Sequence, residues 1–262
     1  MRFMPTSRRH PAAGFAVVLA ALFITAGAFT LFDSETAPVS AAVTSDQAVA
    51  EGKTLFAEGC SSCHGLNAQG TTDGPSLIGV GAAAVDFQVS SGRMPMATQG
   101  VQAPRKAAIY TEEEVAALAA YVASLAPGPA IPTDADISTV GADVARGGEL
   151  FRVNCAQCHN FAGQGGALSE GKYAPNLSKA SARQIYEAML TGPQNMPIFS
   201  DNTLPKKDKQ AIIAYIETLR SGYNPGGLDL GNYGPVTEGL FLWLGGFVIL
   251  TGFAIWIGIK AK

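Results

Sequence analysis

The longest stretches without a charged residue lie near the two ends of the chain, at residues 11–32 and 239–259. A membrane-spanning helix needs about 20 mostly apolar residues, whereas a soluble helix of that length carries polar positions on one face. We therefore predict a transmembrane helix over residues 239–259. Lys260 and Lys262 follow it. Because basic residues favour the cytoplasmic side of a membrane, we expect residues 260–262 to form a cytoplasmic tail.

The N-terminal apolar run allows two interpretations. Basic residues precede it, as they do in signal peptides and in membrane anchors alike. The run is longer than the ~7–15 residues of a typical signal-peptide core, which favours a retained anchor. In contrast, the small residues of the stretch Pro38-Val39-Ser40-Ala41-Ala42 suit cleavage by a signal peptidase. Residues 1–43 are accordingly predicted to be a membrane segment, signal or anchor, followed by a spacer.

Between the two apolar runs, one pattern of apolar positions occurs twice. Residues 50–56 correspond to residues 145–151, and both stretches have apolar positions at helical spacing. Tyr121, in the last helical stretch of the first copy, corresponds to Tyr215 in the second copy. The number of residues between these two tyrosines is almost the same as the number that separates residues 50–56 from residues 145–151. Two domains of like construction are the simplest explanation.

Each copy is predicted to begin and end with a helix, and these two helices are expected to cross. Thr111 and Glu114 form a capping-box sequence that opens the last helix of the first copy. Pro205 falls in the first turn of the last helix of the second copy. Gly52 and Gly147 remove a side chain from each first helix, which lets the last helix approach closely.

This organisation predicts an all-α protein with two tandem domains, at residues 44–126 and 142–222. Stretches rich in proline, glycine and other turn-forming residues follow each domain and read as linkers, at residues 127–141 and 223–238.

The amino-acid composition favours a membrane-attached protein and argues against a nucleic-acid-binding one. An apolar content of 47% with only 15% charged residues fits membrane segments beside globular domains. The formal net charge of −3 is too small to indicate a nucleic-acid partner. Lys206, Lys207 and Lys209 are predicted to be solvated residues at a helix end, with docking to a partner as the alternative interpretation.

All four cysteines fall into a five-residue motif that occurs once in each copy. The two motifs are Cys60-Ser61-Ser62-Cys63-His64 and Cys155-Ala156-Gln157-Cys158-His159. C-x-x-C-H is typical of covalent c-type haem attachment, in which two thiols add to the haem vinyl groups and the histidine binds the iron. A redox C-x-x-C, a zinc site or disulfides do not require a histidine directly after the second cysteine in both motifs. We therefore predict two covalently bound haem c groups and export of these domains across the membrane.

The second iron ligand is expected to be methionine. His64 and His159 are the proximal ligands, and the third histidine, His10, lies before the first apolar run on the other side of the membrane. A second histidine ligand is therefore excluded. Methionine raises the haem reduction potential relative to harder donors.

Two methionines stand before a proline, which fixes the backbone on a loop. Met196, before Pro197, is predicted to bind the second haem iron. For the first haem the choice lies between Met94 and Met96, and Met94 is favoured because it also precedes a proline. Met189 falls in a helical stretch and is expected to pack in the core.

A proline follows each haem motif in a similar loop. Pro75 and Pro175 are placed so that a backbone carbonyl of the loop can accept a hydrogen bond from the proximal imidazole, which fixes the ring.

Taken together, these features resemble a known family. Each copy, with its glycine-bearing helix, C-x-x-C-H, proline loop, Met-Pro and tyrosine-bearing last helix, resembles a class I cytochrome c domain. The tandem pair with one C-terminal membrane helix resembles the dihaem cytochrome cc subunit of the actinobacterial cytochrome bc1 complex. The resemblance covers roughly residues 45–262 and is strongest in residues 92–95, 103–106, 145–160, 171–176 and 190–197.

The resemblance implies a place in the respiratory chain. In this family, menaquinol is oxidised by the partner cytochrome b and Rieske iron–sulfur subunits. Electrons then pass to the first haem, to the second haem, and to the copper centre of an aa3-type oxidase. The chain would serve menaquinol–cytochrome c reductase as an electron carrier on the extracytoplasmic side of the cell membrane, without a catalytic residue of its own.

Two other functions remain open from the sequence. A dihaem electron-transfer subunit of another membrane oxidoreductase, such as a cbb3-type oxidase or a dehydrogenase, would carry the same motifs. A dihaem peroxidase would need one haem with an open distal site. The Met-Pro pair in each copy and the lack of a distal histidine argue against the peroxidase.

Overall fold

A computed structural model describes residues 11–32, 45–221 and 235–260. The first copy of the repeat contains the helices α2 (Ser45–Gly59), α3 (Ser61–His64), α4 (Ala82–Ser90) and α5 (Glu112–Leu125). The second contains α7 (Val144–Asn154), α8 (Ala156–His159), the strands β1 (Gly166–Ala167) and β2 (Tyr173–Ala174), a 3-10 turn (Ser169–Gly171), and α9 (Ala182–Thr191) and α10 (Lys206–Arg220). The predominantly helical fold predicted from the sequence is confirmed.

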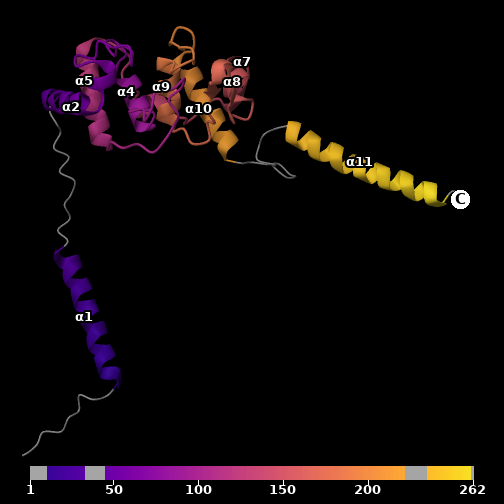
Figure 1. Cartoon of the computed structure of the whole chain (residues 1–262), viewed down its shortest axis with the longest axis horizontal. Coiled ribbons are helices and arrows are strands. Elements are labelled where there is room, and N and C mark those ends of the chain that lie inside the picture. The colour runs from indigo at the N-terminus through magenta and orange to yellow at the C-terminus, as the bar shows by residue number, and fades with distance from the viewer. Residues whose placement is uncertain (1–10, 33–44, 222–234, 261–262) are drawn as a thin grey trace, which may run out of the picture. The chain divides into compact units, whose positions relative to one another are not determined.

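The first copy is built on the pairing of its first and last helices. α2 packs along α5, and α4 packs on the other side of α5 (Figure 1). Phe56 of α2 and Leu118 of α5 are each 1% exposed, at the centre of this core. The capping box that opens α5 is confirmed, because Thr111 N donates to Glu114 Oε2 at 2.8 Å and Glu114 N donates to Thr111 Oγ1 at 3.2 Å.

The second copy repeats this arrangement. α7 packs along α10, and α9 packs beside α10. Phe151 and Ile213 are fully buried between them. Met189 is 2% exposed in the same core, as predicted. Pro205 stands one residue earlier than predicted, as the N-cap of α10, where its missing N–H removes no helical hydrogen bond.

The crossing of first and last helices depends on a glycine in each copy. A Cβ atom on Gly52 would overlap the backbone carbonyl of Ala117, and one on Gly147 would overlap that of Ala211. The predicted close crossing is confirmed. The backbone atoms that come closest belong to the residue one helical turn before Tyr121 or Tyr215, and in the first copy the Cβ atom of Tyr121 follows at 2.9 Å.

Aromatic rings pack next to each crossing. The ring centroids of Phe56 and Tyr121 are 5.2 Å apart, and those of Phe151 and Tyr215 are 5.4 Å apart, with nearly the same tilt. Such tilted pairs add to the stability that comes from burying the rings. The same helix crossing and ring pair thus recur in both copies.

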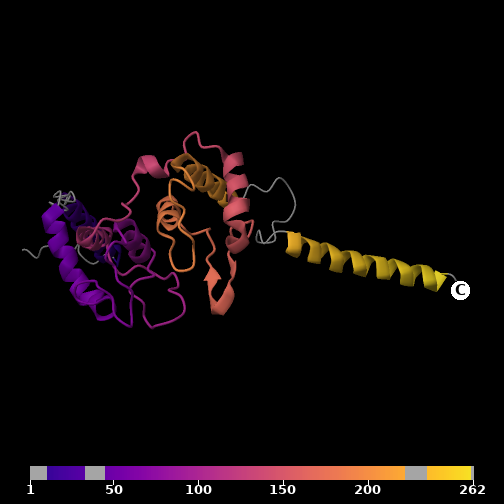
Figure 2. The same ribbon diagram turned by 90° about the horizontal axis from the view of Figure 1, so that it is seen from above.

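A small antiparallel hairpin in the second copy was not predicted. Its strands β1 and β2 pair Gly166 with Ala174 and Ala167 with Tyr173 (Figure 2). Two residues per strand are too few to show an alternating pattern, so the sequence carries no signal for them.

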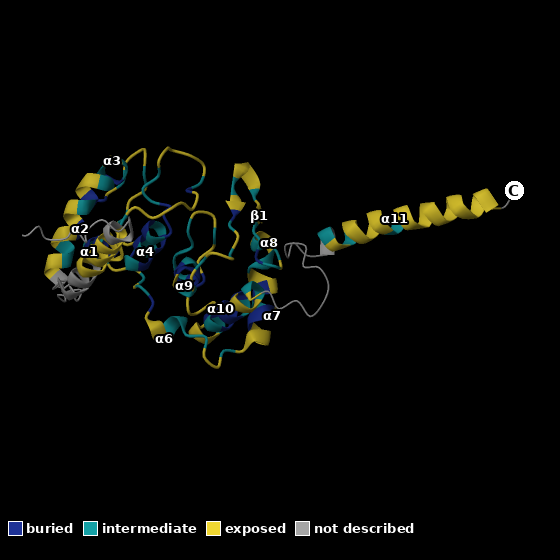
Figure 3. Ribbon diagram, turned by 90° about the horizontal axis from the view of Figure 1, so that it is seen from below, coloured by how far each residue is buried: buried dark blue, intermediate teal, exposed yellow. Residues whose placement is uncertain are grey.

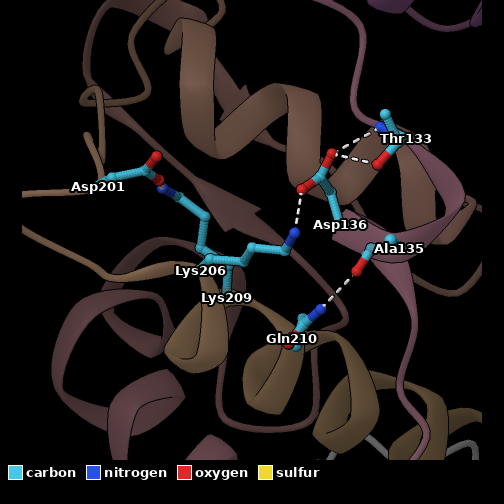
Figure 4. A network of polar contacts seen from close by, with 7 residues as sticks. All are labelled: Thr133, Ala135, Asp136, Asp201, Lys206, Lys209 and Gln210. Atoms are coloured by element: carbon cyan, nitrogen blue, oxygen red, sulfur yellow. Dashed lines mark hydrogen bonds and ion pairs between the residues drawn. The ribbon is translucent and has the colours of Figure 1, made fainter.

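The segment predicted to be a linker between the copies is attached to α10 through the short helix α6 (Asp134–Ile137) (Figure 4). Thr133 N and Oγ1 donate to Asp136 Oδ2 at 2.7 and 2.6 Å. The Lys206 ammonium forms an ion pair with the same carboxylate. Gln210 Nε2 donates to the Ala135 carbonyl at 2.9 Å. These contacts tie the segment to the second copy.

The expectation that Lys209 is a solvated residue is wrong. Its side chain is fully buried, with Nζ 2.5 Å from Asp201 Oδ1 (Figure 4). The same Nζ is 5.5 Å from the centroid of the Tyr186 ring. Lys209 lies one helical turn into α10, on the face that packs against α9, so its charge is compensated inside the fold. Lys207 is exposed, as expected.

The two apolar helices are α1 (Pro11–Phe32) and α11 (Pro235–Lys260). In α11, the 24 residues Thr237–Lys260 are long and apolar enough to cross a membrane, and their side chains are almost all exposed (Figure 3). The bounds of α1 match the N-terminal apolar run of residues 11–32. The side chains of α1 that the structure describes, Phe15–Thr25, form an apolar stretch that is shorter than the one in α11. The candidate cleavage stretch 38–42 and the residues 261–262 lie outside the described residues.

Substituting Gly147 by alanine tests the helix crossing. The added Cβ overlaps the Ala211 carbonyl, so the free energy of unfolding should fall by about 1–3 kcal/mol. Denaturant unfolding followed by circular dichroism measures it. Gly100→Ala is the control: its nearest contact is 3.9 Å away, and its change should stay within about 0.5 kcal/mol. Equal effects of the two substitutions would contradict the close crossing.

The Asp136 carboxylate provides a pH-dependent test of the α6–α10 attachment. Hydrogen bonds from Lys206 and then Thr133 lower the pKa of Asp136 to about 2. A lowered folded-state pKa stabilises the protein above the unfolded value near 4, and this contribution is lost as the pH falls toward 2. Asp136→Asn should therefore lower the free energy of unfolding by about 1–2 kcal/mol at pH 7, with the difference shrinking between about pH 4 and pH 2. A difference that is constant over this range would show that the ion pair does not contribute.

Candidate functional site

Both C-x-x-C-H motifs form a single helical turn directly after the first helix of their copy. His64 N donates to the Cys60 carbonyl at 3.0 Å, and His159 N donates to the Cys155 carbonyl at 2.9 Å. Residues three and four positions apart lie on one face of such a turn. The two thiols and the histidine of each motif are therefore presented together.

Each of these histidines is oriented by a proline carbonyl. His64 Nδ1 is 2.7 Å from the Pro75 carbonyl oxygen, and His159 Nδ1 is 3.0 Å from that of Pro175. A carbonyl only accepts hydrogen bonds, so Nδ1 carries the proton and donates. This leaves the lone pair of Nε2 available to a metal, which is the tautomer that a haem iron requires. Burial lowers the pKa of His159, opposed by this hydrogen bond, and so favours the neutral ring.

The thiols of Cys60 and Cys155 are partly buried against the core of their copy. Burial, and after it the neighbouring Cys63, raises the pKa of Cys60 to about 11, and burial and Cys158 raise that of Cys155 to about 12. Without a bound group, these two thiols are therefore protonated at neutral pH. In the parts of the chain that the structure describes, no three His, Cys, Asp or Glu side chains converge on one point.

Met94 lies on a loop that is held by Lys106, which follows later in the first copy. Met94 and Cys60 both pack against the first core. The Lys106 ammonium donates to the carbonyl oxygens of Gly92 at 2.5 Å, Arg93 at 3.2 Å and Pro95 at 2.6 Å. These three carbonyls surround Met94 in the sequence.

Gly92 is the residue that allows this contact. Its φ is +69°, and a Cβ atom there would overlap the carbonyl of Lys106. Met96 is half-buried, and it follows the three residues whose carbonyl oxygens accept hydrogen bonds from Lys106. The loop geometry is therefore centred on Met94, the methionine favoured from the sequence.

Met196 lies in a cavity of the second copy. It packs against the second core, and it lines the same cavity as Cys158 and Pro175. His159 does not line the cavity itself but contacts Pro175, which does. A cavity with apolar side chains, a thiol and a thioether in its wall, next to an oriented imidazole, fits the needs of a haem c.

Several polar contacts join the two copies. Gln102 Nε2 donates to the Tyr173 carbonyl at 2.7 Å, and Tyr173 N donates to Gln102 Oε1 at 2.8 Å. Gln194 Nε2 donates to the Ala103 carbonyl at 3.2 Å. Sequence reasoning did not identify these residues or Lys106. Residues 103–106 belong to the stretches in which the sequence resembles the cytochrome cc subunits most strongly. A local sequence pattern nevertheless does not show which loops contact one another.

Where α4 packs against α9, an acidic side chain is buried. Glu187 is fully buried, and neither of its carboxyl oxygens has a hydrogen-bond partner among the described residues. Burial, and after it the facing Asp86 carboxyl, raises the pKa of Glu187 to about 10. The carboxyl is therefore protonated at neutral pH, which avoids an unpaired buried charge between the copies.

Comparison with known proteins identifies the family. Residues 49–126 match the family model "Cytochrome c", and residues 142–216 match "Cytochrome C oxidase, cbb3-type, subunit III". The chain is 50% identical to the cytochrome bc1 complex cytochrome c subunit of Corynebacterium efficiens, over 86% of this chain and 81% of that protein. It is 48% identical to that of Mycobacterium tuberculosis, over 97% and 92%.

This chain belongs to the family of cytochrome bc1 complex cytochrome c subunits. The cbb3-type cytochrome c oxidase subunit FixP of Bradyrhizobium diazoefficiens is a more distant relative, 26% identical over 75% of this chain and 68% of that protein. The two cytochrome c domains and the apolar C-terminal helix agree with the predicted fold class. They also support haem c as the cofactor.

Proposed function

We propose that the chain is a membrane-anchored dihaem c-type cytochrome that relays electrons within a respiratory complex. The first domain would attach haem through Cys60 and Cys63, with His64 and Met94 as iron ligands. The second domain would attach haem through Cys155 and Cys158, with His159 and Met196 as iron ligands. The carbonyls of Pro75 and Pro175 would orient the two histidines. The observation that carries this proposal is the His–Pro contact in both C-x-x-C-H motifs, in a chain that is similar to bc1 cytochrome c subunits over nearly its whole length.

The proposed path begins at the Rieske centre and ends at the copper centre of an aa3-type oxidase. The partners would be the cytochrome b and Rieske subunits, which oxidise menaquinol, and the oxidase. A relay needs two carriers in a fixed relation and has no use for an open iron that binds substrate. The hydrogen bonds between the copies supply such a fixed relation. The haem domains would lie on the extracytoplasmic side, with the C-terminus in the cytoplasm.

The haem iron would supply the one-electron redox chemistry, and the residues of the chain would support it in three ways. The proline carbonyls would hold each imidazole ring. The cores pack against Cys60 and Cys155, the first cysteine of each motif. A thioether ligand would raise the reduction potential.

A second function is a dihaem subunit of a cbb3-type oxidase or a dehydrogenase. The match of residues 142–216 to the cbb3-type subunit III model favours it. The difference between 50% and 26% identity favours the bc1 complex.

Purification through a tag on the C-terminus tests the function. We expect b-type and a-type haem bands, a Rieske protein and oxidase subunits to co-purify with the c-type signal in mild detergent. A denatured chain whose mass includes two haems would establish covalent attachment. Cells that express the untagged chain are the control. Recovery of the chain alone, or with a dehydrogenase, would contradict the relay while leaving the haem domains unaffected.

Substituting Lys106 by methionine tests the first iron ligand. Loss of the three hydrogen bonds to the loop should weaken the Met94–iron bond. We expect a lower potential for one haem, partial loss of the far-red charge-transfer band of ferric methionine-ligated haem, and faster carbon monoxide binding to about half of the ferrous haem.

Lys207→Met is the matched control, because Lys207 is exposed and its substitution changes the net charge by the same amount as Lys106→Met. It should leave the band, the potentials and the slow carbon monoxide binding of the native protein unchanged. If Lys106→Met behaves like this control, the lysine does not position the ligand.

A further inference from the structure

The pocket of the second domain is partly walled by the first domain. Its lining includes Cys158 and Met196 from the second domain, and Arg93, Gln102 and Arg105 from the first. The second proposed haem site is therefore complete only where both domains meet.

The lining of this pocket changes from apolar to cationic. Near Cys158 and Met196 the lining includes apolar side chains, among them Leu177, Ile185 and Ala188. An adjoining hollow shares Arg93, Arg105 and Asn176 with the pocket and adds the polar side chain of Ser178 and the cationic side chain of Lys179. Neither lining contains an aspartate or glutamate among the described residues. Haem has the same division, because its ring is apolar and its two propionate carboxylates lie on one edge.

Arg93 is a buried cation without a counter-charge. Its side chain belongs to a residue that is only 8% exposed, and its guanidinium lies 4.8 Å from the centroid of the Phe87 ring. Within residues 45–221, no carboxylate is within ion-pair distance of Arg93 or Arg105. A cation over an aromatic ring recovers only about 0.5–2 kcal/mol. A buried charge otherwise needs a charged partner.

Arg105 adds a second cation to the same hollow. It is exposed, and its Nη1 donates to Gln184 Oε1 of the second domain at 3.0 Å. Lys172, which also lines the pocket, is already paired with Glu170 at 3.2 Å. Arg93, Arg105 and Lys179 are thus the cations of this lining without a carboxylate partner among the described residues. Of these, the two guanidinium groups suit a carboxylate best, because they bind it in a two-point geometry.

We propose that Arg93 and Arg105 of the first domain bind a propionate carboxylate of the haem that is attached to the second domain. This inference rests on the proposed function, since it requires a haem at Cys155 and Cys158. The side chain of Arg93 then contacts the second haem, while its neighbour in the chain, Met94, binds the first iron. One short loop thereby holds parts of both sites.

The test measures the haem potentials of the full chain in the purified complex. Removing a cation beside the second haem favours the ferric form, so its midpoint potential should fall in Arg93→Gln and Arg105→Gln, and further in the double variant. The first haem should change less. The haem whose potential moves in a separate Met94→His variant identifies the first haem. Arg93→Lys, which keeps the charge, should restore part of the potential.

A second measurement reports on the propionate itself. The resonance Raman bands of the propionate groups should shift in the arginine variants and not in Arg152→Gln, an exposed arginine that serves as the charge-matched control. Arg105 is exposed, so its variant should fold even if Arg93→Gln does not. The mass of the native chain distinguishes a failure of the proposed dihaem function from a failure of the arginine–propionate contact. A native chain with fewer than two haems would contradict the proposed function itself and not only the role of the arginines.

Two results would overturn the inference. One is a double variant that carries two haems with native potentials and native propionate bands. The other is a native second-haem potential that depends saturably on added phosphate at constant ionic strength and loses this dependence in the double variant. That result would assign the hollow to a free anion instead of the propionate.

Discussion

The close contact between two helix backbones in each domain is the constraint on which the rest depends. At Gly52 and Gly147 any side chain would collide with the carbonyl of Ala117 or Ala211. This contact fixes the crossing of the first and last helices, places Phe56 and Phe151 in the cores, and sets the direction in which the first helix enters the C-x-x-C-H turn. The position of each haem motif therefore follows from helix packing.

The two domains are alike on the histidine side and different on the methionine side. Both imidazoles donate to a proline carbonyl of the following loop. In contrast, the first methionine loop is held by the ammonium of Lys106, whereas the second contacts the first domain through Gln194. If Met94 and Met196 bind the haem irons as proposed, this difference between their loops would let the protein set two different potentials with the same ligand set.

The contact between the domains is polar and specific. The side-chain amide of Gln102 exchanges two hydrogen bonds with the backbone of Tyr173, and the Arg105 guanidinium donates to Gln184. The protonated Glu187 lies where α4 meets α9. Directional hydrogen bonds define one relative placement of the domains better than an apolar contact does, because the donors and acceptors are satisfied in only one arrangement. A fixed placement is what transfer of an electron between two neighbouring carriers requires.

The sequence by itself determined the elements whose signals are local. Helical periodicity predicted the helices, and Thr111 and Glu114 predicted the start of one of them. The equivalent glycines Gly52 and Gly147 predicted the helix crossing in each copy. The haem motifs also follow from residue types at fixed spacing. Only the tertiary structure decided that Lys209 is buried, that Lys106 holds the Met94 loop, and that Arg93 faces the second domain. These depend on which side chains meet in the folded chain, both within a domain and between the two domains, and no local pattern encodes which loops come together.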